Sequence, residues 1–151
     1  MDYNLLLQQA QSEGIQNLVV GAFIKRNGKF LIVKRSETDD FLPGIHEIPS
    51  GGVDEGEDLE TALRREVIEE TGLNILSIDR YINYFDYISG SGKKARQFNF
   101  LVSVDEDAPV ILNSVEHSEY SWSDGKNNEF NGLFNLSEKT KTCLVEAQQY
   151  L

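Results

Sequence analysis

The stretch GGVDEGEDLETALRREVIEETGL, residues 51–73, decides the fold, because it places acidic side chains where a helix would turn several of them toward one point. Residues 54–70 hold eight acidic residues and two arginines, a local charge of −6, while the whole chain of 151 residues carries −11. Like charges repel one another unless they are solvated, protonated or bridged by a cation. The stretch therefore indicates either a solvated helix face or a bound divalent cation.

A helix over residues 58–71 accounts for this pattern. Asp58 is a suitable N-cap, and Gly72 suits the left-handed position that ends a helix. At about 100° per residue, Glu66 and Glu70 fall inside the apolar stripe, whereas a solvated charged face would lie opposite the leucines. Because burying an unpaired carboxylate is costly, we expect these two acids to meet a cation. The stripe itself consists of Leu59, Ala62, Leu63 and Val67.

The composition argues against several classes of protein. A pI near 4.6 argues against binding to duplex nucleic acid, whose affinity comes mainly from Lys and Arg on phosphates. No apolar run approaches the roughly 20 residues that span a bilayer, and nothing at the N-terminus resembles a secretory signal. The single Cys143 precludes an intramolecular disulfide. We therefore expect a cytoplasmic protein that binds neither duplex nucleic acid nor a membrane.

We expect one domain over residues 1–151, because no linker or repeat divides the chain. Asn27-Gly28 is a strong hairpin signal between two runs rich in β-branched and aromatic residues, and Ser89–Gly92 connects a second such pair. The expected strands are 17–25, 29–35, 46–48, 75–88, 95–104 and 119–123; the expected helices are 1–11, 58–71 and 137–151, the last capped by Ser137 with Cys143, Leu144, Ala147 and Leu151 in its apolar stripe.

Residues 51–73 resemble the Nudix box of the MutT-like Nudix hydrolases, G-x5-E-x7-R-E-U-x-E-E-x-G-U, where U is a bulky aliphatic residue. Residues 43–52 resemble the family's lead-in P-G-x-W-E-x-P-G-G, with His46 at the usual Trp and Ser50 at the first glycine. The resemblance implies an α/β/α sandwich with a mixed sheet and a catalytic loop-helix-loop. Every constrained position of the box matches: Gly51, Glu57, Arg65, Glu66, Val67, Glu69, Glu70, Gly72 and Leu73.

The same resemblance implies an activity. Nudix hydrolases cleave a pyrophosphate bond in a nucleoside diphosphate linked to another moiety, and they use Mg²⁺ or Mn²⁺. The implied metal ligands are Glu66, Glu69, Glu70 and the backbone carbonyl of Ser50. The implied partner is a small nucleotide or nucleotide derivative, with a (deoxy)nucleoside triphosphate slightly favoured. The sequence does not distinguish a monomer from a homodimer.

Other residues receive roles by the same resemblance. Arg65 and Glu57 tie the loop to the helix, and Gly51 and Gly72 are structural positions of the box. The general base is either Glu66 or a carboxylate outside the box. Glu119, three residues before Trp122, is the preferred outside residue and an expected further catalytic group, with Glu116 second. Glu119 and Glu116 are interpreted equally well as surface acids near the edge of a strand.

The residues that determine substrate specificity are harder to identify from the sequence. Arg35 matches a position where the family often has a phosphate-facing base, and Phe41 is a candidate for stacking on a nucleobase. The alternatives are a sheet-edge arginine and a core aromatic. His46 and His117 lack the spaced partners of a zinc site and are interpreted as structural. Tyr84, Tyr87 and Phe98 are further stacking candidates, and Lys93, Lys94 and Arg96 form a basic cluster interpreted as a solubilising turn.

Two other functions on the same fold stay open. One is a module that binds a nucleotide and regulates without turnover, although such a module has no need of an intact set of box acids. The other is an isomerase of an allylic diphosphate, for which the sequence offers no additional metal or cysteine group.

Overall fold

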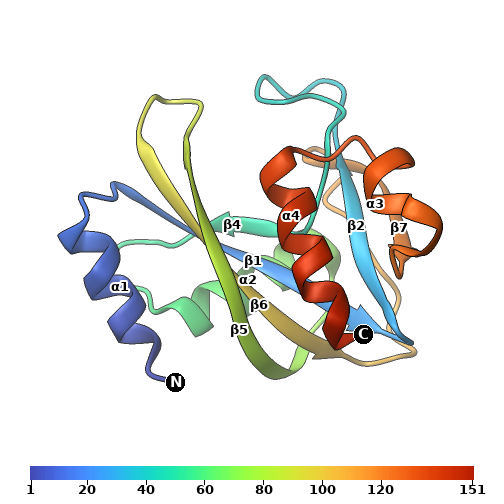
Figure 1. The fold of residues 1–151 in the computed structure, drawn as a ribbon, viewed down its shortest axis with the longest axis horizontal. Coiled ribbons are helices and arrows are strands. Elements are labelled where there is room, and N and C mark those ends of the chain that lie inside the picture. Colours follow the sequence, from blue (N-terminus) through green and yellow to red (C-terminus); the bar gives the residue numbers. More distant parts are fainter.

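The computed structural model describes residues 1–151, and its ribbon shows a curved sheet with helices on both faces (Figure 1). The helices are α1 (Tyr3–Ser12), α2 (Leu59–Thr71), α3 (Glu129–Gly132) and α4 (Glu138–Ala147), with 3-10 turns η1 (Lys126–Asn128) and η2 (Gln148–Tyr150). The strands are β1 (Asn17–Arg26), β2 (Lys29–Arg35), β3 (His46–Glu47), β4 (Ser50–Gly52), β5 (Ile75–Ile88), β6 (Lys94–Val104) and β7 (His117–Ser123).

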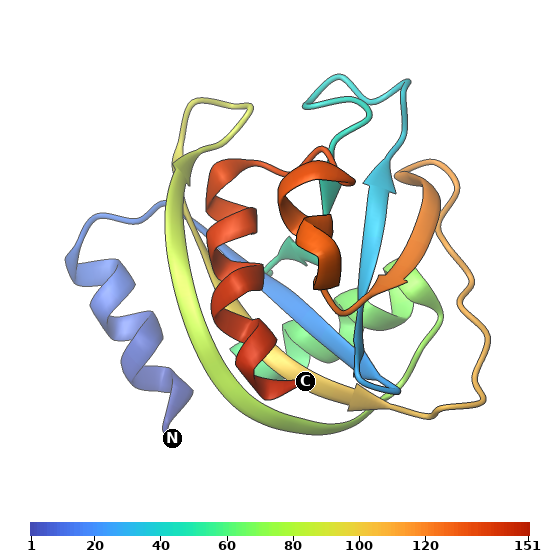
Figure 2. The same ribbon diagram turned by 45° about the vertical axis from the view of Figure 1, so that its right-hand side comes forward.

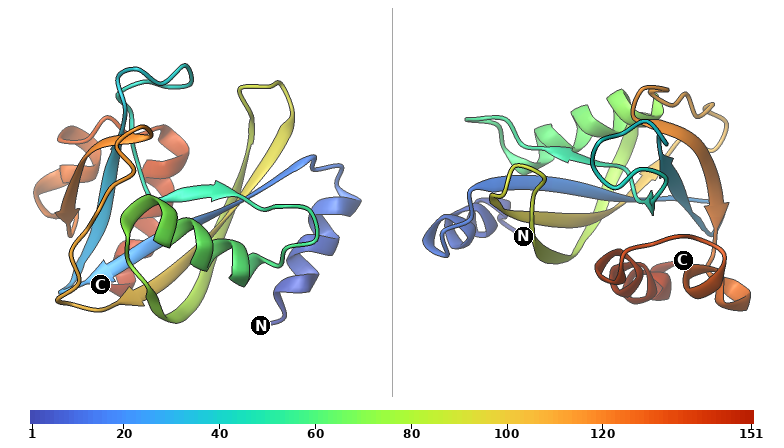
Figure 3. Two further views of the ribbon diagram at one scale, coloured as in Figure 1. Left: turned by 180° about the vertical axis from the view of Figure 1, so that it is seen from behind. Right: turned by 90° about the horizontal axis from the view of Figure 1, so that it is seen from above.

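The α/β/α sandwich expected from the sequence is confirmed. Seen from above, α2 lies on one face of the sheet and α4 on the other (Figure 3). Each face has its own apolar core: Val67 of α2 belongs to one cluster and Leu144 of α4 to the other. β1 and β6 contribute alternate residues to the two clusters, as expected for central strands covered on both faces.

The sheet is mixed and open. β1 pairs in parallel with β6 over nine residue pairs, from Asn17↔Ala95 to Lys25↔Ser103, while β5 and β6 form a long antiparallel hairpin. On its other edge, β1 pairs with β4 near its start and with β2 only at its end. This edge of β1 is therefore shared between β4, at residues 19–21, and β2, at residues 25–26. β7 completes the sheet by pairing with β2.

Most expected elements are confirmed within one or two residues. The Asn27-Gly28 turn has both residues at positive φ, 52° and 72°, as a tight hairpin requires. β4 and α3 were not expected, and the terminal helix ends at Ala147 and continues as η2 rather than as α-helix. No helix of the chain is long and apolar enough to cross a bilayer.

Helix α2 begins and ends as the sequence predicts. Asp58 Oδ1 accepts a hydrogen bond from the Thr61 N–H at 2.7 Å, and Gly72 adopts φ 71° and donates its N–H to the Ile68 carbonyl. The four apolar residues of the predicted stripe are all buried, and so is Glu70. The helix therefore directs an acidic side chain into the interior, at the point where β4 crosses its C-terminal half.

Two connections extend beyond the sheet at the same end of the molecule. Residues 36–45 join β2 to β3, and residues 89–93 join β5 to β6 (Figure 2). They approach each other closely, since a Cβ at Gly90 would lie 3.2 Å from the Phe41 ring. Phe41, Leu42 and Ile45 of the first connection, with Ile88 at the end of β5, line a cavity between the sheet and α4.

Candidate active site

Glu70 is the most deeply buried acid of the box. Only 5% of the residue is exposed, and its Oε2 accepts a hydrogen bond at 3.0 Å from the backbone N–H of Ser50 in β4. Burial raises the pKa of this carboxyl to about 9, and the negative charges of Glu47, Glu116 and Glu66 add to the effect. This buried carboxyl, with three other carboxylates near it, is therefore a favourable ligand for a cation.

Glu66 lies one turn earlier on the same face, with 14% of its side chain exposed. Its carboxylate occupies the space that a Cβ at Gly51 would fill, so the first glycine of the box is needed for close approach of backbone and acid. Burial raises the pKa of Glu66, while the hydrogen bond from Arg65 Nη1 at 2.6 Å opposes the change. Glu66 and Glu70 therefore both lie against β4, as the helix projection predicts.

Arg65 holds the loop before α2 against the helix. Its guanidinium donates to both Glu57 oxygens at 2.8 and 2.9 Å and to the Gly52 carbonyl at 2.9 Å. This bidentate bond lowers the pKa of Glu57 to about 2 and raises that of Arg65. Arg65 Nη1 also lies 3.3 Å from Oε2 of Glu69, whose side chain is 55% exposed. The structure thus brings Arg65 and Glu57 together as a structural tie.

A second group of residues approaches Glu70 from the other side. Atoms of Glu70, Glu116 and His117 lie within 4.8 Å of one another. The buried His117 places Nε2 3.1 Å from Glu47 Oε2, while its Nδ1 has no hydrogen-bond partner. Sequence reasoning missed Glu47 and His117 as members of this site. The match of Glu47 to the acid of the lead-in motif was the available signal.

Glu119 is not brought into this group. In the β2–β7 pair it lies opposite Lys34, and its charge acts on His46 rather than on the box acids. His46 itself packs edge-on against Phe134 and accepts a hydrogen bond at Nδ1 from the Asn135 N–H. Glu116, the second choice from the sequence, is the outside carboxylate that the structure places near Glu70 and Glu66.

The residues present fit a divalent cation. Hard cations such as Mg²⁺ take carboxylate and carbonyl oxygens, and the buried acids on α2 offer the first of these beside the Ser50 backbone. Burial raises the pKa of both Glu66 and Glu70, and of the two only Glu66 has a cationic partner in the chain, Arg65. In the neighbouring group, Nδ1 of the buried His117 also has no hydrogen-bond partner. The cluster is therefore able to hold a metal ion.

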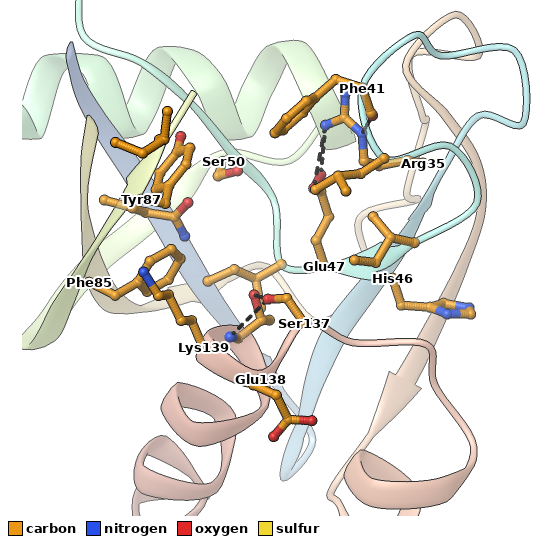
Figure 4. A pocket seen from close by; sticks show the side chains of 16 residues that line it. Arg35, Phe41, His46, Glu47, Ser50, Phe85, Tyr87, Ser137, Glu138 and Lys139 are labelled. Atoms are coloured by element: carbon orange, nitrogen blue, oxygen red, sulfur yellow. Dashed lines mark hydrogen bonds and ion pairs between the residues drawn. The ribbon is translucent and has the colours of Figure 1, made fainter. Parts of the chain in front are cut away.

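A cavity of about 490 Å³ adjoins this cluster (Figure 4). Ser50, Glu47, Arg35 and Phe41 line it, so the structure brings both predicted substrate residues to one wall. Arg35 is already engaged, because it pairs with Asp39 at 2.6 Å and Glu47 at 3.4 Å and donates to the Phe41 carbonyl. It therefore lies at the border between the cavity and the acidic cluster.

The other aromatic and basic candidates divide between surface and core. Tyr87 lines the cavity, whereas Phe98 is buried in the core and Tyr84 lies under the guanidinium of Arg96. Arg96 is buried and paired with Asp86 and Glu13, so it joins α1 to the sheet rather than solubilising a turn. The basic residues 93–96 therefore do not act as one cluster.

Comparison with known proteins agrees with this geometry. The NUDIX domain family model matches residues 16–127. The uncharacterized Nudix hydrolase YfcD of Escherichia coli K12 is 34% identical over 97 residues, covering 63% of this chain and 51% of YfcD. Nucleoside triphosphatase NudI of Escherichia coli ATCC 8739 is 39% identical over 61 residues, covering 40% of this chain and 43% of NudI.

Among solved structures, the MutT protein from Methanosarcina mazei Go1 superposes with a TM-score of 0.76 at 28% identity, covering 91% of this chain and 96% of that one. The chain spans about half the length of the curated relatives it matches. The resemblance inferred from the box is confirmed, since the family match extends well beyond residues 51–73 on both sides. This chain belongs to the Nudix family.

Proposed function

We propose that the protein is a divalent-metal-dependent hydrolase that cleaves a pyrophosphate bond in a nucleoside diphosphate linked to another moiety, with a slight preference for a (deoxy)nucleoside triphosphate or a modified nucleotide. The observation that carries the proposal is the convergence of Glu66 and Glu70 beside Ser50, with Glu116 facing them. These carboxylates adjoin a cavity that Ser50 and Glu47 line, and burying them would be costly in a merely structural role.

In this proposal Glu66, Glu70 and the Ser50 carbonyl hold Mg²⁺ or Mn²⁺, and the more exposed Glu69 is a further candidate ligand. Such an ion supplies charge neutralisation for the phosphate oxygens and a lowered pKa for water. Arg65 acts indirectly, by keeping the loop and Glu66 in position.

The general base in this proposal is Glu116, with Glu66 as the alternative. Glu116 is exposed, so its carboxylate can take a proton from the attacking water and release it to solvent. Glu66 is largely buried and already accepts from Arg65, which leaves it less free to receive a proton. Glu119, the preference from the sequence, lies on the Lys34 side of the sheet.

The cavity supports a nucleoside as the group attached to the phosphates. Its volume of about 490 Å³ lies within the usual range for small-molecule sites. Phe41 and Tyr87 on its wall offer aromatic surface to a base, and Arg35 stands between them and the acidic cluster. The name of the relative NudI, a nucleoside triphosphatase, favours a triphosphate.

The alternative is a regulatory module that binds a nucleotide without turnover. The complete set of box acids, their burial and their tie to Arg65 favour the hydrolase, because binding alone does not require them.

A panel assay distinguishes the two functions. Release of phosphate and pyrophosphate is measured from nucleoside triphosphates, dinucleoside polyphosphates, ADP-ribose and nucleotide sugars, with Mg²⁺ or Mn²⁺ and with EDTA as control. Metal-dependent release with identified products supports the hydrolase. Binding of a nucleotide without any release across the panel overturns it in favour of the regulatory module.

A further inference from the structure

A row of four polar side chains leads from α4 to the cavity, on the face of the sheet opposite α2. Gln97 Nε2 donates to Asn99 Oδ1 at 2.8 Å, Asn99 Nδ2 donates to Asn83 Oδ1 at 2.9 Å, and Asn83 Nδ2 donates to Glu146 Oε2 at 2.7 Å. Gln97 is 7% exposed and Asn99 is fully buried. Three amides in a row therefore end at one carboxylate.

The carboxylate sets the direction of the whole row. An ionised carboxylate only accepts hydrogen bonds, whereas an amide side chain donates at one end and accepts at the other. Because Glu146 accepts, Asn83 presents its oxygen to Asn99, and Asn99 in turn presents its oxygen to Gln97. Gln97 is then held with its nitrogen toward Asn99 and its oxygen, Oε1, free for another donor.

The position of the row is built into β1. A Cβ at Gly21 would overlap Asn99 Oδ1 and crowd Gln97 Nε2, so the glycine makes room for the amides. Gly21 pairs with Asn99 of β6 on one side and with Ser50 of β4 on the other. Asn99 is thus one strand away from Ser50, the residue that donates a hydrogen bond to Glu70.

Gln97 lines the cavity, and its Oε1 is the free end of the row. Gln97 is a lining residue, its Oε1 accepts no hydrogen bond from the chain, and the atom is not among the buried polar atoms left without a partner. Ligand or solvent in the cavity therefore reaches an acceptor of fixed orientation. Phe85, Tyr87 and Ile48 add apolar and aromatic surface to the same cavity, as suits a flat heterocycle.

We propose that Gln97 is a specificity-determining residue that accepts a hydrogen bond from an amino N–H of the bound nucleobase, and that Asn99, Asn83 and Glu146 are positioning residues that keep its oxygen toward the base. This inference rests on the proposed function for its substrate class, a nucleotide. A base lacking an N–H donor leaves the oxygen of Gln97 without a partner, and a site built around such a bond discriminates against that base.

The test compares two nucleotides that differ only in the donor: adenosine triphosphate and purine riboside triphosphate, which lacks the 6-amino group. GTP and ITP form a second pair that differs in the 2-amino group. Both kcat/KM with Mn²⁺ and the dissociation constant in EDTA, from isothermal titration calorimetry, are measured. We expect the wild-type protein to favour the amino-bearing member of at least one pair by about tenfold in both quantities.

The variants separate recognition from folding. Gln97→Leu removes the acceptor. It is expected to bring the ratio between the two members of a nucleotide pair, in kcat/KM and in the dissociation constant, close to one. Glu146→Gln keeps the size and the bond to Asn83 but lets the row reverse its direction, so the ratio is expected to fall about threefold with an unchanged melting temperature. Glu146 is exposed, which keeps this variant informative even where Gln97→Leu unfolds. Glu106→Gln, on an exposed turn outside the row, is the matched control.

The outcomes separate this inference from the proposed function. Equal values for both members of each pair in the wild-type protein, or a ratio that survives both Gln97→Leu and Glu146→Gln, overturns the role of Gln97. If the protein hydrolyses no nucleotide but its dissociation constants show the expected ratio, the proposed hydrolase activity is wrong and the role of Gln97 in recognising the base stands. Absence of both hydrolysis and binding overturns both.

Discussion

Replacing Glu70 with Gln is expected to stabilise the metal-free protein at neutral pH. The Gln side chain has the shape of the protonated acid, still accepts from the Ser50 N–H, and carries no charge at any pH. In the folded protein the pKa of Glu70 is raised from 4.5 to about 9, so the folded state binds this proton more tightly than the unfolded state. The stability present below pH 4.5 is therefore lost progressively as the pH rises toward 9.

The magnitude at pH 7 follows from the distance to the ordinary pKa of 4.5. Each pH unit between the unfolded pKa and the working pH lowers the free energy of unfolding by about 1.4 kcal/mol. Holding the proton on Glu70 at pH 7 therefore lowers it by about 3 kcal/mol. Because Glu70 is almost fully buried, screening by solvent reduces this free energy only slightly. For a chain of this size the gain corresponds to about 10 °C in melting temperature.

The assay is thermal unfolding followed by circular dichroism in EDTA, at pH 5 and pH 7. Glu70→Gln should melt about 10 °C above the wild-type protein at pH 7 and within about 3 °C of it at pH 5. Glu60→Gln, an exposed acid on the same helix paired with Arg64, should change little at either pH. Added Mn²⁺ should raise the melting temperature of the wild-type protein but not that of Glu70→Gln.

A variant less stable than the wild-type protein at pH 7 in EDTA would refute this reasoning. So would a difference that stays the same between pH 5 and pH 7, because the effect must follow the titration of the acid.

Three further predictions concern the same loop-helix-loop and its neighbour β7. Gly51→Ala should push the Glu66 carboxylate out of place, destabilise the protein by about 1–3 kcal/mol and weaken Mn²⁺ binding at least tenfold by calorimetry. Gly72→Ala, forced to a φ of 71°, should lower the free energy of unfolding by about 1 kcal/mol in urea while the kcat of refolded protein is unchanged. Glu116→Gln should lower kcat by about a hundredfold and Glu119→Gln by less than about twofold, and the reverse order would return the role to Glu119.

The parts of the molecule that depend on local sequence could be predicted. Asp58 and Gly72 delimit α2 through short-range capping, and the spacing of Glu66 and Glu70 follows from helix periodicity alone. The hairpin at Asn27-Gly28 is similarly local. These features require only residues that are neighbours in the chain.

The parts that depend on distant pairing could not be predicted. β4 is three residues long and contains two glycines, and it forms a strand only because β1 offers a free edge. The parallel pairing of β1 with β6 joins segments some 78 residues apart in sequence, and it is this pairing that brings Asn99 beside Gly21. His117 approaches Glu47 and Glu70 through the register of β7 on β2, which no local pattern encodes.

The central claim is that the box acids hold the metal for hydrolysis of a nucleotide. Its most direct test is kcat/KM for metal-dependent pyrophosphate or phosphate release by Glu70→Gln, beside Glu60→Gln and the wild-type protein, on the best substrate of the panel. We predict a loss of more than about a hundredfold for Glu70→Gln with a fold that is intact or stabilised, and little change for Glu60→Gln. Turnover by Glu70→Gln at the wild-type rate would contradict the account.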